Sequence, residues 1–558
     1  MIGRALAVVA AALVPSVVSA QAADCDRVAA TLKLPDAKVT AARLVPAGSF
    51  TPPATGTETP RAIANLPAFC RVELTITPSS DSDIKSEVWM PVSGWNGKFQ
   101  QVGNGAFAGS IQYGALGEAL RRGYAAASTD TGHTGPGAEW ALGHPEKIID
   151  FGYRALKETT DNAKAIIAAL TATSPARSYF VGCSDGGREA LMEAQRFPAD
   201  FDGIVAGAPA NFWTHLLAAA AWTQQALLET PGSYIPPAKL PAVQAAALAA
   251  CDLVEDAIQD GIVGDPRDCT FDPTVLQCTG ADTNACLTGP QATALKKIYA
   301  GPHNPRTGAL IHPGHEAGAE APPASFPAWE TGPSLAAIGN ALLNQFSVNF
   351  FRFMVFDDAT FDIRTLNFDS DIAFTDSKLV NGQPLASVLN STNPDLSAFQ
   401  KHGGKLIHYH GWNDPAIGPR NSINYYESVA TAQRPGKGQG KGEDKVGLSR
   451  TQDFYRLFMV PGMLHCGGGP GPNTFGQGAP LADADHDVVK ALEQWVEHGI
   501  APDRIIATKF VNDNPANGVA LTRPLCPYPQ VAVLARPGAD TNDAHNFICV
   551  DDERGSTR

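Results

Sequence analysis

Residues 178–189 read SYFVGCSDGGRE and contain the pattern Gly-x-Ser-x-Gly, with Ser184 at its centre. The apolar residues before the pattern are typical of a buried β-strand, and residues 187–197 after it have a helical pattern. A strand that turns sharply into a helix exposes the serine hydroxyl at the edge of a sheet, and small neighbours leave room for the turn. The stretch therefore predicts an α/β fold in which Ser184 is a nucleophile.

Strand and helix patterns continue on both sides of this stretch. Residues 155–171 have apolar side chains at helical spacing. Apolar runs of strand length occupy residues 73–77, 86–91, 123–128, 202–209, 405–410 and 454–460. Between about residues 210 and 393 this alternation gives way to Ala-rich helical pieces, Pro-rich connections and four cysteines. We therefore predict an α/β domain of residues 24–209 and 394–558, interrupted by a lid domain of residues 210–393.

A serine hydroxyl needs a base to take its proton and an acid to orient that base. In α/β hydrolases the acid and then the histidine follow the serine, each after a later strand. Asp414 follows the predicted strand 405–410, and His465 follows the predicted strand 454–460. Alone, Asp414 is also explained as a turn residue before proline, and His465 as a loop residue. Their order and register favour an α/β-hydrolase core with a Ser184, Asp414, His465 triad.

Charge argues against one class of partner. The 558 residues include 42 basic and 56 acidic side chains, which gives a net charge of -14, and the basic residues are scattered. Proteins that track nucleic-acid phosphates carry a basic surface. We therefore expect no nucleic-acid partner.

The first residues are typical of an export signal. A short positive start, MIGR, precedes apolar residues 5–14, and residues 18–20 read VSA, a small-x-small cleavage pattern. The alternative, a membrane span, needs about 20 apolar residues, and Pro15 interrupts the segment. We predict a signal peptide of residues 1–20, a mature chain that begins near residue 21 or 24, a secreted or periplasmic location, and no membrane anchor.

All ten cysteines lie after that cleavage site. An even number in an exported chain is typical of disulfides, and zinc is disfavoured because no Cys-x-x-Cys pair is present. Cys183 directly precedes Ser184, and Cys466 directly follows His465. If Ser184 and His465 meet, a bridge between these cysteines comes within reach, since bridged Cα atoms lie about 4.4 to 6.8 Å apart. Pairing of each with another cysteine stays open on these grounds.

Longer motifs point to one family. The order Cys-Ser, Asp, His-Cys resembles the tannase and feruloyl esterase family, which also includes mono(2-hydroxyethyl) terephthalate hydrolase. Similar segments are WNGKF at 95–99, SYFVGCSDGGRE at 178–189, RFP at 196–198, residues 201–209, residues 460–469 and RPLCPYP at 523–529. The resemblance implies the triad above and the Cys183–Cys466 bridge. It pairs the other cysteines as Cys25–Cys70, Cys251–Cys269, Cys278–Cys286 and Cys526–Cys549.

Acyl transfer also needs donors for the tetrahedral oxyanion. The fold supplies the amide after the nucleophile, that of Asp185, and we expect a second donor from the Gly-rich turn of residues 103–109. By resemblance, counted from Trp95, that donor is the amide of Ala106, where the family usually has glycine. Alanine keeps the amide and restricts the backbone of the turn.

Residues 251–262 read CDLVEDAIQDGI, with aspartates at every fourth position. Carboxylates and backbone oxygens are ligands that Ca²⁺ prefers; the alternative is the acidic face of a solvated helix. The resemblance implies a structural Ca²⁺ in the lid, without a role in the chemistry. Its ligands would be Asp252, Asp256, Asp260 and the carbonyls of Ile258 and Ile262. One residue more than in the family separates the first two aspartates, so Glu255 is an alternative to Asp252.

The resemblance also implies a small aromatic ester as substrate, with feruloyl (hydroxycinnamoyl) or galloyl esters as leading candidates. Candidates for the acyl pocket are Phe346, Ser347 and the run FFRF at residues 350–353. Packing inside the lid explains the aromatic residues equally well. A terephthalate monoester is less favoured, because Leu342 replaces the arginine that meets its carboxylate in the family. A serine peptidase and a catalytically silent, calcium-stabilised binding protein are the remaining alternatives; the silent protein would need a broken triad.

Overall fold

The computed structural model describes residues 25–54, 60–253, 258–435 and 441–552. Its centre is a nine-stranded sheet with the order β1-β4-β5-β7-β6-β8-β9-β12-β13. The pairs from β1 to β7 are antiparallel, and those from β7 to β13 are parallel. The strands are β1 (Ala37–Val45), β4 (Phe69–Ile76), β5 (Ile84–Pro91), β6 (Lys98–Val102), β7 (Ala125–Thr129), β8 (Arg177–Cys183), β9 (Gly203–Gly207), β12 (Lys405–Gly411) and β13 (Tyr455–Val460).

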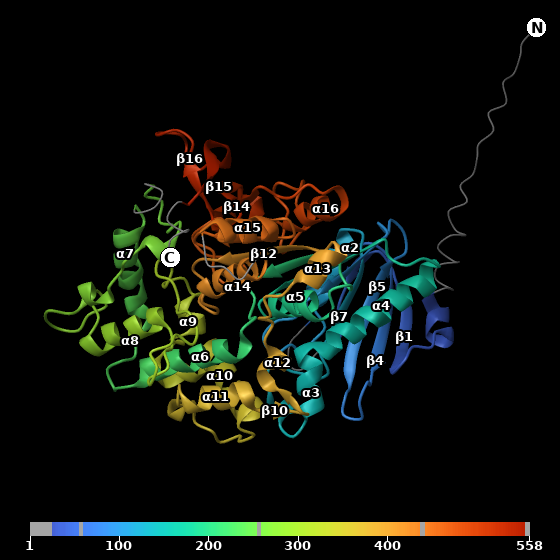
Figure 1. Ribbon diagram of the computed structural model, residues 1–558, viewed down its shortest axis with the longest axis horizontal. Helices are drawn as coiled ribbons and strands as arrows, with labels where there is room; N and C mark the ends of the chain where they lie inside the picture. The colour runs from blue at the N-terminus through green and yellow to red at the C-terminus, as the bar shows by residue number, and fades with distance from the viewer. Residues whose placement is uncertain (1–24, 55–59, 254–257, 436–440, 553–558) are drawn as a thin grey trace, which may run out of the picture.

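Two apolar cores lie on the two faces of this sheet. Phe180 and Leu406 pack with helices on one face, and their chain neighbours Tyr179 and Ile407 pack with helices on the other. The first face is covered by α4 (Ala155–Thr171), α5 (Asp185–Arg196) and α14 (Arg420–Ala432), and the second by α2 (Tyr113–Arg121) and α16 (Val488–His498) (Figure 1). Burial on both faces explains the continuous apolar runs of these strands. The fold is α/β, as the sequence predicts.

The strand order reverses at β6. After β6 the chain crosses through α2 to β7 on one side, and it later enters β8 on the other side. Such a reversal opens a crevice at the carboxyl ends of the strands, where α/β proteins bind their ligands. The turn of residues 103–109 follows β6, and Ser184 follows β8. The topology therefore places the predicted oxyanion turn next to the predicted nucleophile.

The sequence predicts seven of these strands and the helix α4, but it does not predict β1 or β6. In β6, which reads KFQQV, Gln100 and Gln101 are buried inside the sheet. Gln101 donates to the Leu156 carbonyl at 3.2 Å and accepts from the Thr160 hydroxyl at 2.7 Å, both on α4. A buried glutamine side chain needs hydrogen-bond partners, and here they come from another element. The sequence of β6 therefore lacks the apolar pattern that predicts a buried strand.

The chain leaves the sheet after β9 and returns in its neighbour β12, so residues 210–393 do not interrupt the sheet. Their helices lie together on one side of the molecule, coloured green to yellow in Figure 1. They include α6 (Trp213–Leu228), α7 (Leu240–Cys251), α8 (Gly289–Ala300), α10 (Leu342–Asn349) and α11 (Ser370–Ser377), with a short ribbon of β10 (Leu379–Val380) and β11 (Gln383–Pro384). The bounds of a separate lid domain stay a prediction.

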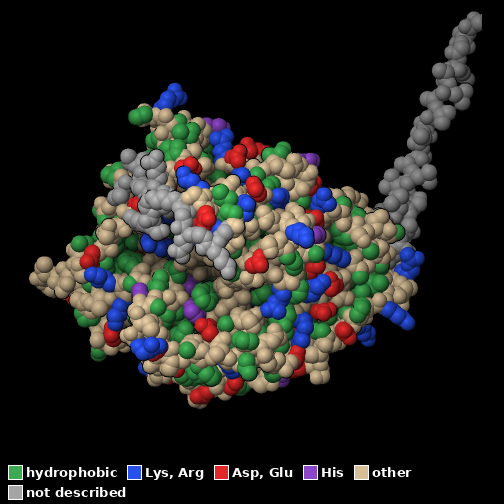
Figure 2. Space-filling view, viewed as in Figure 1, with side chains coloured by type: hydrophobic (Ala, Val, Ile, Leu, Met, Phe, Trp, Pro, Cys, Tyr) green, Lys and Arg blue, Asp and Glu red, His purple; other side chains and the backbone are tan. Residues whose placement is uncertain are grey.

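Two further ribbons lie outside the large sheet near the C-terminus. They pair β14 (Ile505–Phe510) with β15 (Val519–Leu525), and β16 (Gln530–Leu534) with β17 (Phe547–Asp551). None of the helices formed by the described residues has the length and apolarity to cross a bilayer. On the face shown in Figure 2, basic and acidic side chains are interspersed.

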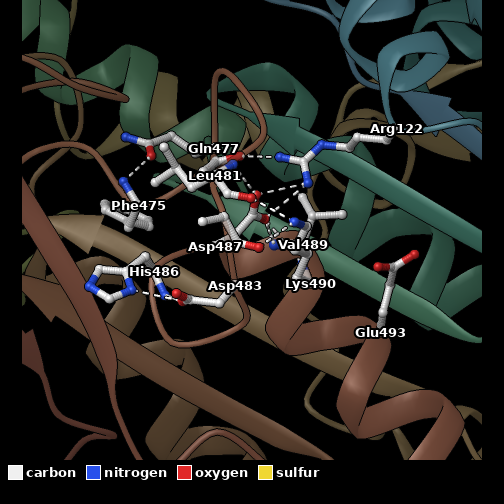
Figure 3. Close-up of polar contacts among 12 residues, drawn as sticks. Arg122, Phe475, Gln477, Leu481, Asp483, His486, Asp487, Val489, Lys490 and Glu493 are labelled. Carbon is white, nitrogen blue, oxygen red and sulfur yellow. Dashed lines mark hydrogen bonds and ion pairs between the residues drawn. The ribbon is translucent and has the colours of Figure 1, made fainter. Parts of the chain in front are cut away.

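One buried ion pair fixes the segment that leads into α16. Asp487 is fully buried, and its carboxylate oxygens accept from Arg122 Nη1 at 3.0 and 2.9 Å (Figure 3). Asp487 also caps α16 by accepting from the amides of Val489 and Lys490, and it accepts from the amide of Leu481 at 2.8 Å. Because Arg122 lies at the end of α2, the pair joins the C-terminal part of the core to the crossover between β6 and β7.

We predict that Asp487→Ala lowers the free energy of unfolding by about 3 to 5 kcal/mol, because it leaves the Arg122 guanidinium buried without its partner and removes a helix cap. Urea unfolding followed by circular dichroism measures the change. The control is Asp483→Ala, whose side chain is 57% exposed and whose loss should change stability by about 0.5 kcal/mol or less. Equal stability of the two variants would contradict the prediction.

Candidate active site

The turn at Ser184 has a strained backbone that close packing holds in place. Ser184 has φ of 67° and ψ of -122°, and α5 begins at the next residue. Such positive φ values are rare outside glycine and occur at functional sites. The Ser184 amide donates to the Gly207 carbonyl at 3.0 Å, and a Cβ on Gly182 would lie 2.4 Å from the carbonyl oxygen of Gly186. Both glycines of the motif are therefore required by backbone packing.

Two backbone amides at this turn have no acceptor. Neither the Ala106 amide nor the Asp185 amide donates a hydrogen bond to any part of the chain that the structure describes. The Gly186 amide donates to the Asn104 carbonyl at 2.8 Å, which ties the turn after β6 to the start of α5. Ala106 has φ of 54° and lines the same pocket as Ser184. Two N–H donors without acceptors therefore lie at the positions where the sequence predicts the oxyanion site.

The predicted acid and base are in contact. Nδ1 of His465 lies 2.7 Å from Oδ2 of Asp414, which is fully buried in the loop after β12. The other Asp414 oxygen accepts from the amides of Ala416 at 2.7 Å and Ile417 at 3.0 Å. With its proton on Nδ1, the His465 ring presents Nε2 as an acceptor. Within the described residues no hydrogen bond joins Ser184 Oγ to His465, and contacts of this kind often tighten only with bound substrate.

The pKa of Asp414 is held well below its ordinary value. Burial by itself would raise this pKa, but the charge of His465 and the hydrogen bonds from His410 and His465 outweigh burial. Asp414 therefore stays ionised at neutral pH, and the stabilisation that depends on its charge is lost as the pH falls through the lowered pKa. An ionised carboxylate in this position orients the imidazole and stabilises the imidazolium that forms during catalysis.

A disulfide joins the chain neighbours of Ser184 and His465. The Cys183–Cys466 bridge spans 283 positions of sequence, and its Cα atoms lie 6.0 Å apart. It holds the end of β8 against the loop that follows β13. The structure also contains the pairs Cys25–Cys70, Cys251–Cys269, Cys278–Cys286 and Cys526–Cys549, the same pairs that the resemblance implies.

An uncharged pocket opens at Ser184. It encloses about 410 Å³, its open mouth included, and helices of the 210–393 segment supply most of its wall. Trp213, Trp329 and Phe346 are its aromatic lining residues, and none of the lining residues is charged. The Trp329 ring stands edge-on to the His465 ring, with centroids 5.0 Å apart. The nucleophile and the base thus border an aromatic pocket.

Comparison with known proteins gives the family. The model of the family described as tannase and feruloyl esterase matches residues 70–550. The chain belongs to the tannase and feruloyl esterase family. An uncharacterized esterase of Xanthomonas campestris is 50% identical over 99% of this chain and 95% of its own. A probable feruloyl esterase B-1 of Aspergillus fumigatus is 32% identical over 93% of each chain.

Solved structures agree with this assignment. Feruloyl esterase B from Aspergillus oryzae is similar with a TM-score of 0.83 and 29% identity, over 95% of this chain and all of that chain. The tannin acyl hydrolase from Aspergillus niger has a TM-score of 0.76 at 23% identity, over 97% of this chain and 96% of that chain, and supports the fold. The protein is therefore a carboxylic ester hydrolase with an α/β-hydrolase fold.

Of the residues predicted to line the acyl pocket, Phe346 lines the pocket at Ser184, and Ser347 does not. Ser347 is fully buried, and its hydroxyl donates to the Asn344 carbonyl one helical turn earlier, at 3.1 Å. In the aromatic run of residues 350–353, Phe350 and Phe351 are buried in the apolar core of the 210–393 segment. The alternative of packing inside the lid holds for these two residues.

Sequence reasoning missed three residues of the site. Trp213 and Trp329 lie more than 100 positions apart, and no spacing pattern connects either with Ser184. His408 and His410 alternate with apolar residues on one strand, a pattern that predicts structural side chains. In the structure His410 Nε2 lies 3.2 Å from Asp414 Oδ2. Alternation shows that a side chain faces one side of the sheet, but not what it meets there.

The predicted calcium ligands of the esterase are described in part. Asp256, and Glu255 as the alternative, lie outside the described residues. Asp252 is buried; its Oδ2 accepts from the Gly261 amide at 3.1 Å, and its Oδ1 has no partner among the described residues. A buried carboxylate oxygen without a partner is costly, and a bound cation would satisfy it.

The other described members of the set are close in sequence and mostly buried. Asp260 accepts from the Ile262 amide at 3.1 Å and pairs with Arg523 at 2.5 Å, and Ile258 and Ile262 are buried. The Arg523 guanidinium binds Oδ2 of Asp260, and the Ile262 amide donates to Oδ1. The residues present therefore fit a Ca²⁺ site made of carboxylates and backbone carbonyls.

We predict that replacing both Cys183 and Cys466 by alanine lowers kcat about 10- to 100-fold, because a displacement of about 1 Å at a reacting group can cost 10²-fold in rate. Labelling of Ser184 by a fluorophosphonate probe should slow in parallel. Ser184→Ala should take no label, and a Cys278→Ala, Cys286→Ala variant should react like the parent enzyme. An unchanged rate in a folded Cys183, Cys466 variant would contradict the prediction.

Proposed function

We propose that the chain is an exported serine esterase that hydrolyses esters of feruloyl-type aromatic acids through an acyl-enzyme on Ser184. One observation carries the proposal: Ser184 and an acceptor-free amide of the oxyanion turn line the same uncharged pocket, whose wall carries three aromatic side chains. Family membership supports ester hydrolysis, and the pocket supports the aromatic acyl group.

The proposed reaction has two halves, acylation of Ser184 and hydrolysis of the acyl-enzyme. His465 Nε2 takes the proton of Ser184 as the hydroxyl oxygen attacks the ester carbonyl carbon, and the amides of Ala106 and Asp185 stabilise the oxyanion. A donor of this kind typically contributes about 10² to 10³ in rate. His465 then protonates the departing alkoxide, which leaves as the alcohol. Water, deprotonated by His465, attacks the acyl-enzyme, and Ser184 regains its proton as the acid departs.

The pocket favours an acyl group with an aromatic ring and no charge. Trp213, Trp329 and Phe346 offer aromatic faces and edges to a planar ring. A terephthalate monoester would bring a free carboxylate into a lining without a cation, which is costly; Leu342 instead of arginine agrees with this.

The number of ring oxygens also discriminates between candidate acids. Trp213 lines the pocket, and its buried indole N–H has no acceptor among the described residues; we propose that the bound substrate brings a ring oxygen to this donor. A galloyl ring brings three hydroxyls, each of which needs a partner when buried. A feruloyl ring brings one hydroxyl and a methoxy group and fits this lining better.

Export agrees with the cysteine chemistry. The ten cysteines form five disulfides, a pattern that persists in oxidising compartments. The proposed signal peptide of residues 1–20 lies outside the described residues.

A structural Ca²⁺ completes the proposal for the lid. Asp252, Asp256 and Asp260 with the carbonyls of Ile258 and Ile262 would hold it. When bound, it would neutralise the aspartates and tie the loop after α7 together.

We predict that Trp213→Phe lowers kcat/KM for methyl ferulate about 5-fold, because it keeps an aromatic ring but removes an N–H donor worth about 1 kcal/mol. Methyl cinnamate, which has no ring oxygen, should be hydrolysed with little change by both forms. Trp222→Phe is the matched control, since the Trp222 N–H donates to the Lys297 carbonyl outside this pocket. The same panel should show weaker hydrolysis of methyl gallate and of a terephthalate monoester. Equal losses on ferulate and cinnamate would contradict a donor role for Trp213.

We predict that a chelator lowers the Tm of the protein and that added Ca²⁺ restores it, because a ligand that binds only the folded state stabilises it, by about 2.7 kcal/mol at 100 times its Kd. Asp252→Asn should weaken this response. Asp282→Asn, at a residue that is 58% exposed and paired with Lys239 in the same segment, should retain it. A Tm of the unaltered chain that is the same with chelator and with Ca²⁺ would rule out the site.

A further inference from the structure

A row of buried polar side chains lies behind the catalytic acid. The Tyr455 hydroxyl is 2.7 Å from His408 Nδ1, and His408 Nε2 is 2.8 Å from Ser422 Oγ. The same Ser422 Oγ is 2.6 Å from His410 Nδ1, and His410 Nε2 is 3.2 Å from Asp414 Oδ2. All five residues are buried, with exposed fractions of 1% or less. The row connects the start of β13, through β12 and the first turn of α14, with the triad.

The groups at the two ends of the row determine which ring nitrogens of His408 and His410 carry a proton. His410 Nε2 faces two acceptors, Asp414 Oδ2 and the Ile417 carbonyl, both at 3.2 Å, so Nε2 carries the proton. Burial lowers the pKa of His408 well below its ordinary value and raises that of Tyr455, so the first is a neutral ring and the second a protonated hydroxyl.

One assignment with neutral rings then satisfies every contact. Tyr455 donates to His408, His408 donates to Ser422, Ser422 donates to His410, and His410 donates to Asp414. A serine hydroxyl has one proton to give and accepts from others, which is what its place between two imidazoles requires. All four hydrogen bonds point toward the carboxylate, and each can polarise the next in the dry interior.

We propose that His410 is a positioning residue of the esterase. The row from Tyr455 through His408 and Ser422 fixes the His410 ring, so that Asp414 presents Oδ2 to His465. The proposal rests on the triad assigned above. Oδ2 accepts from both histidines, whereas Oδ1 accepts only from backbone amides. His410 therefore acts on the oxygen that orients the catalytic base, without touching the substrate pocket.

Other groups also face Asp414. His315 of the 210–393 segment has Nδ1 3.3 Å from the Asp414 backbone carbonyl, and its Nε2 lies 3.6 Å from Glu330. Neither contact reaches the Asp414 carboxylate, because the first goes to the backbone carbonyl of Asp414 and the second to Glu330. Among the described side chains, His410 and His465 are the two that donate to the carboxylate of Asp414.

The test compares His410→Leu, His410→Gln and Ser422→Ala in the full chain, with pH profiles of kcat/KM for methyl ferulate. His410→Leu removes a donor that lowers the pKa of Asp414. The carboxylate is then protonated at a higher pH, so activity should be lost earlier on acidification. We expect kcat to fall about 10- to 100-fold, less than the roughly 10⁴-fold loss when an orienting aspartate is itself replaced, with KM nearly unchanged. His410→Gln, whose side-chain amide can still donate, should restore part of both effects.

A double-mutant cycle tests whether Ser422 acts through His410, as the row of hydrogen bonds requires. Ser422→Ala should lower kcat in the parent enzyme but have little further effect in His410→Leu, because it acts through His410. Ser428→Ala is the control: Ser428 lies on the same helix, and its hydroxyl donates to the Tyr425 carbonyl, outside the row. Thermal melts show that each variant is folded.

The outcomes separate this inference from the proposed function. If Ser184→Ala and Asp414→Asn keep their activity, the triad itself is wrong. If they lose it, while the His410 and Ser422 variants show additive losses and an unshifted acid limb, the row is only structural and the inference is overturned.

Discussion

The covalent link between Cys183 and Cys466 is the constraint on which the active site depends. The nucleophile and the base stand on loops that are nearly 300 positions apart, yet their reaction requires a placement within a fraction of an ångström. The sheet brings the ends of β8 and β13 to one edge, but β9 and β12 lie between them. A disulfide directly beside both residues restricts the motion of the Ser184 turn relative to the loop that carries His465.

Beneath the nucleophile, one buried cation connects the core with the 210–393 segment. Arg188 of α5 pairs with Asp185 at 2.6 Å and donates to the carbonyl of Gly152 at 2.9 Å. Its guanidinium lies 5.4 Å from the centroid of the Trp213 ring. A planar, delocalised cation tolerates such surroundings better than an ammonium group does. The same side chain therefore supports the helix that follows Ser184 and the wall of the acyl pocket.

The residues that hold the Asp414 carboxylate and the residues that line the pocket come largely from different parts of the chain. The predicted acid Asp414 is held by polar residues of β12, β13 and α14, whereas the pocket at Ser184 is lined mainly by residues 210–393. The same segment also contacts the predicted base and acid, because Trp329 packs against His465 and His315 meets the Asp414 backbone carbonyl. The two predicted oxyanion donors, the amides of Ala106 and Asp185, lie in the segments that follow the neighbouring strands β6 and β8, where the strand order reverses.

The sequence by itself determined the fold class, and it predicts the nucleophile, acid and base, because each prediction depends on local patterns: a glycine-flanked serine after an apolar strand, and polar residues directly after later strands. The cysteine pairing also followed from the family resemblance. Only the tertiary structure decided what His410, Trp213, Trp329 and Ser347 contact, and that β6 is a central strand despite its two glutamines. These residues take their function from partners on other elements, which a pattern along one strand or helix does not contain.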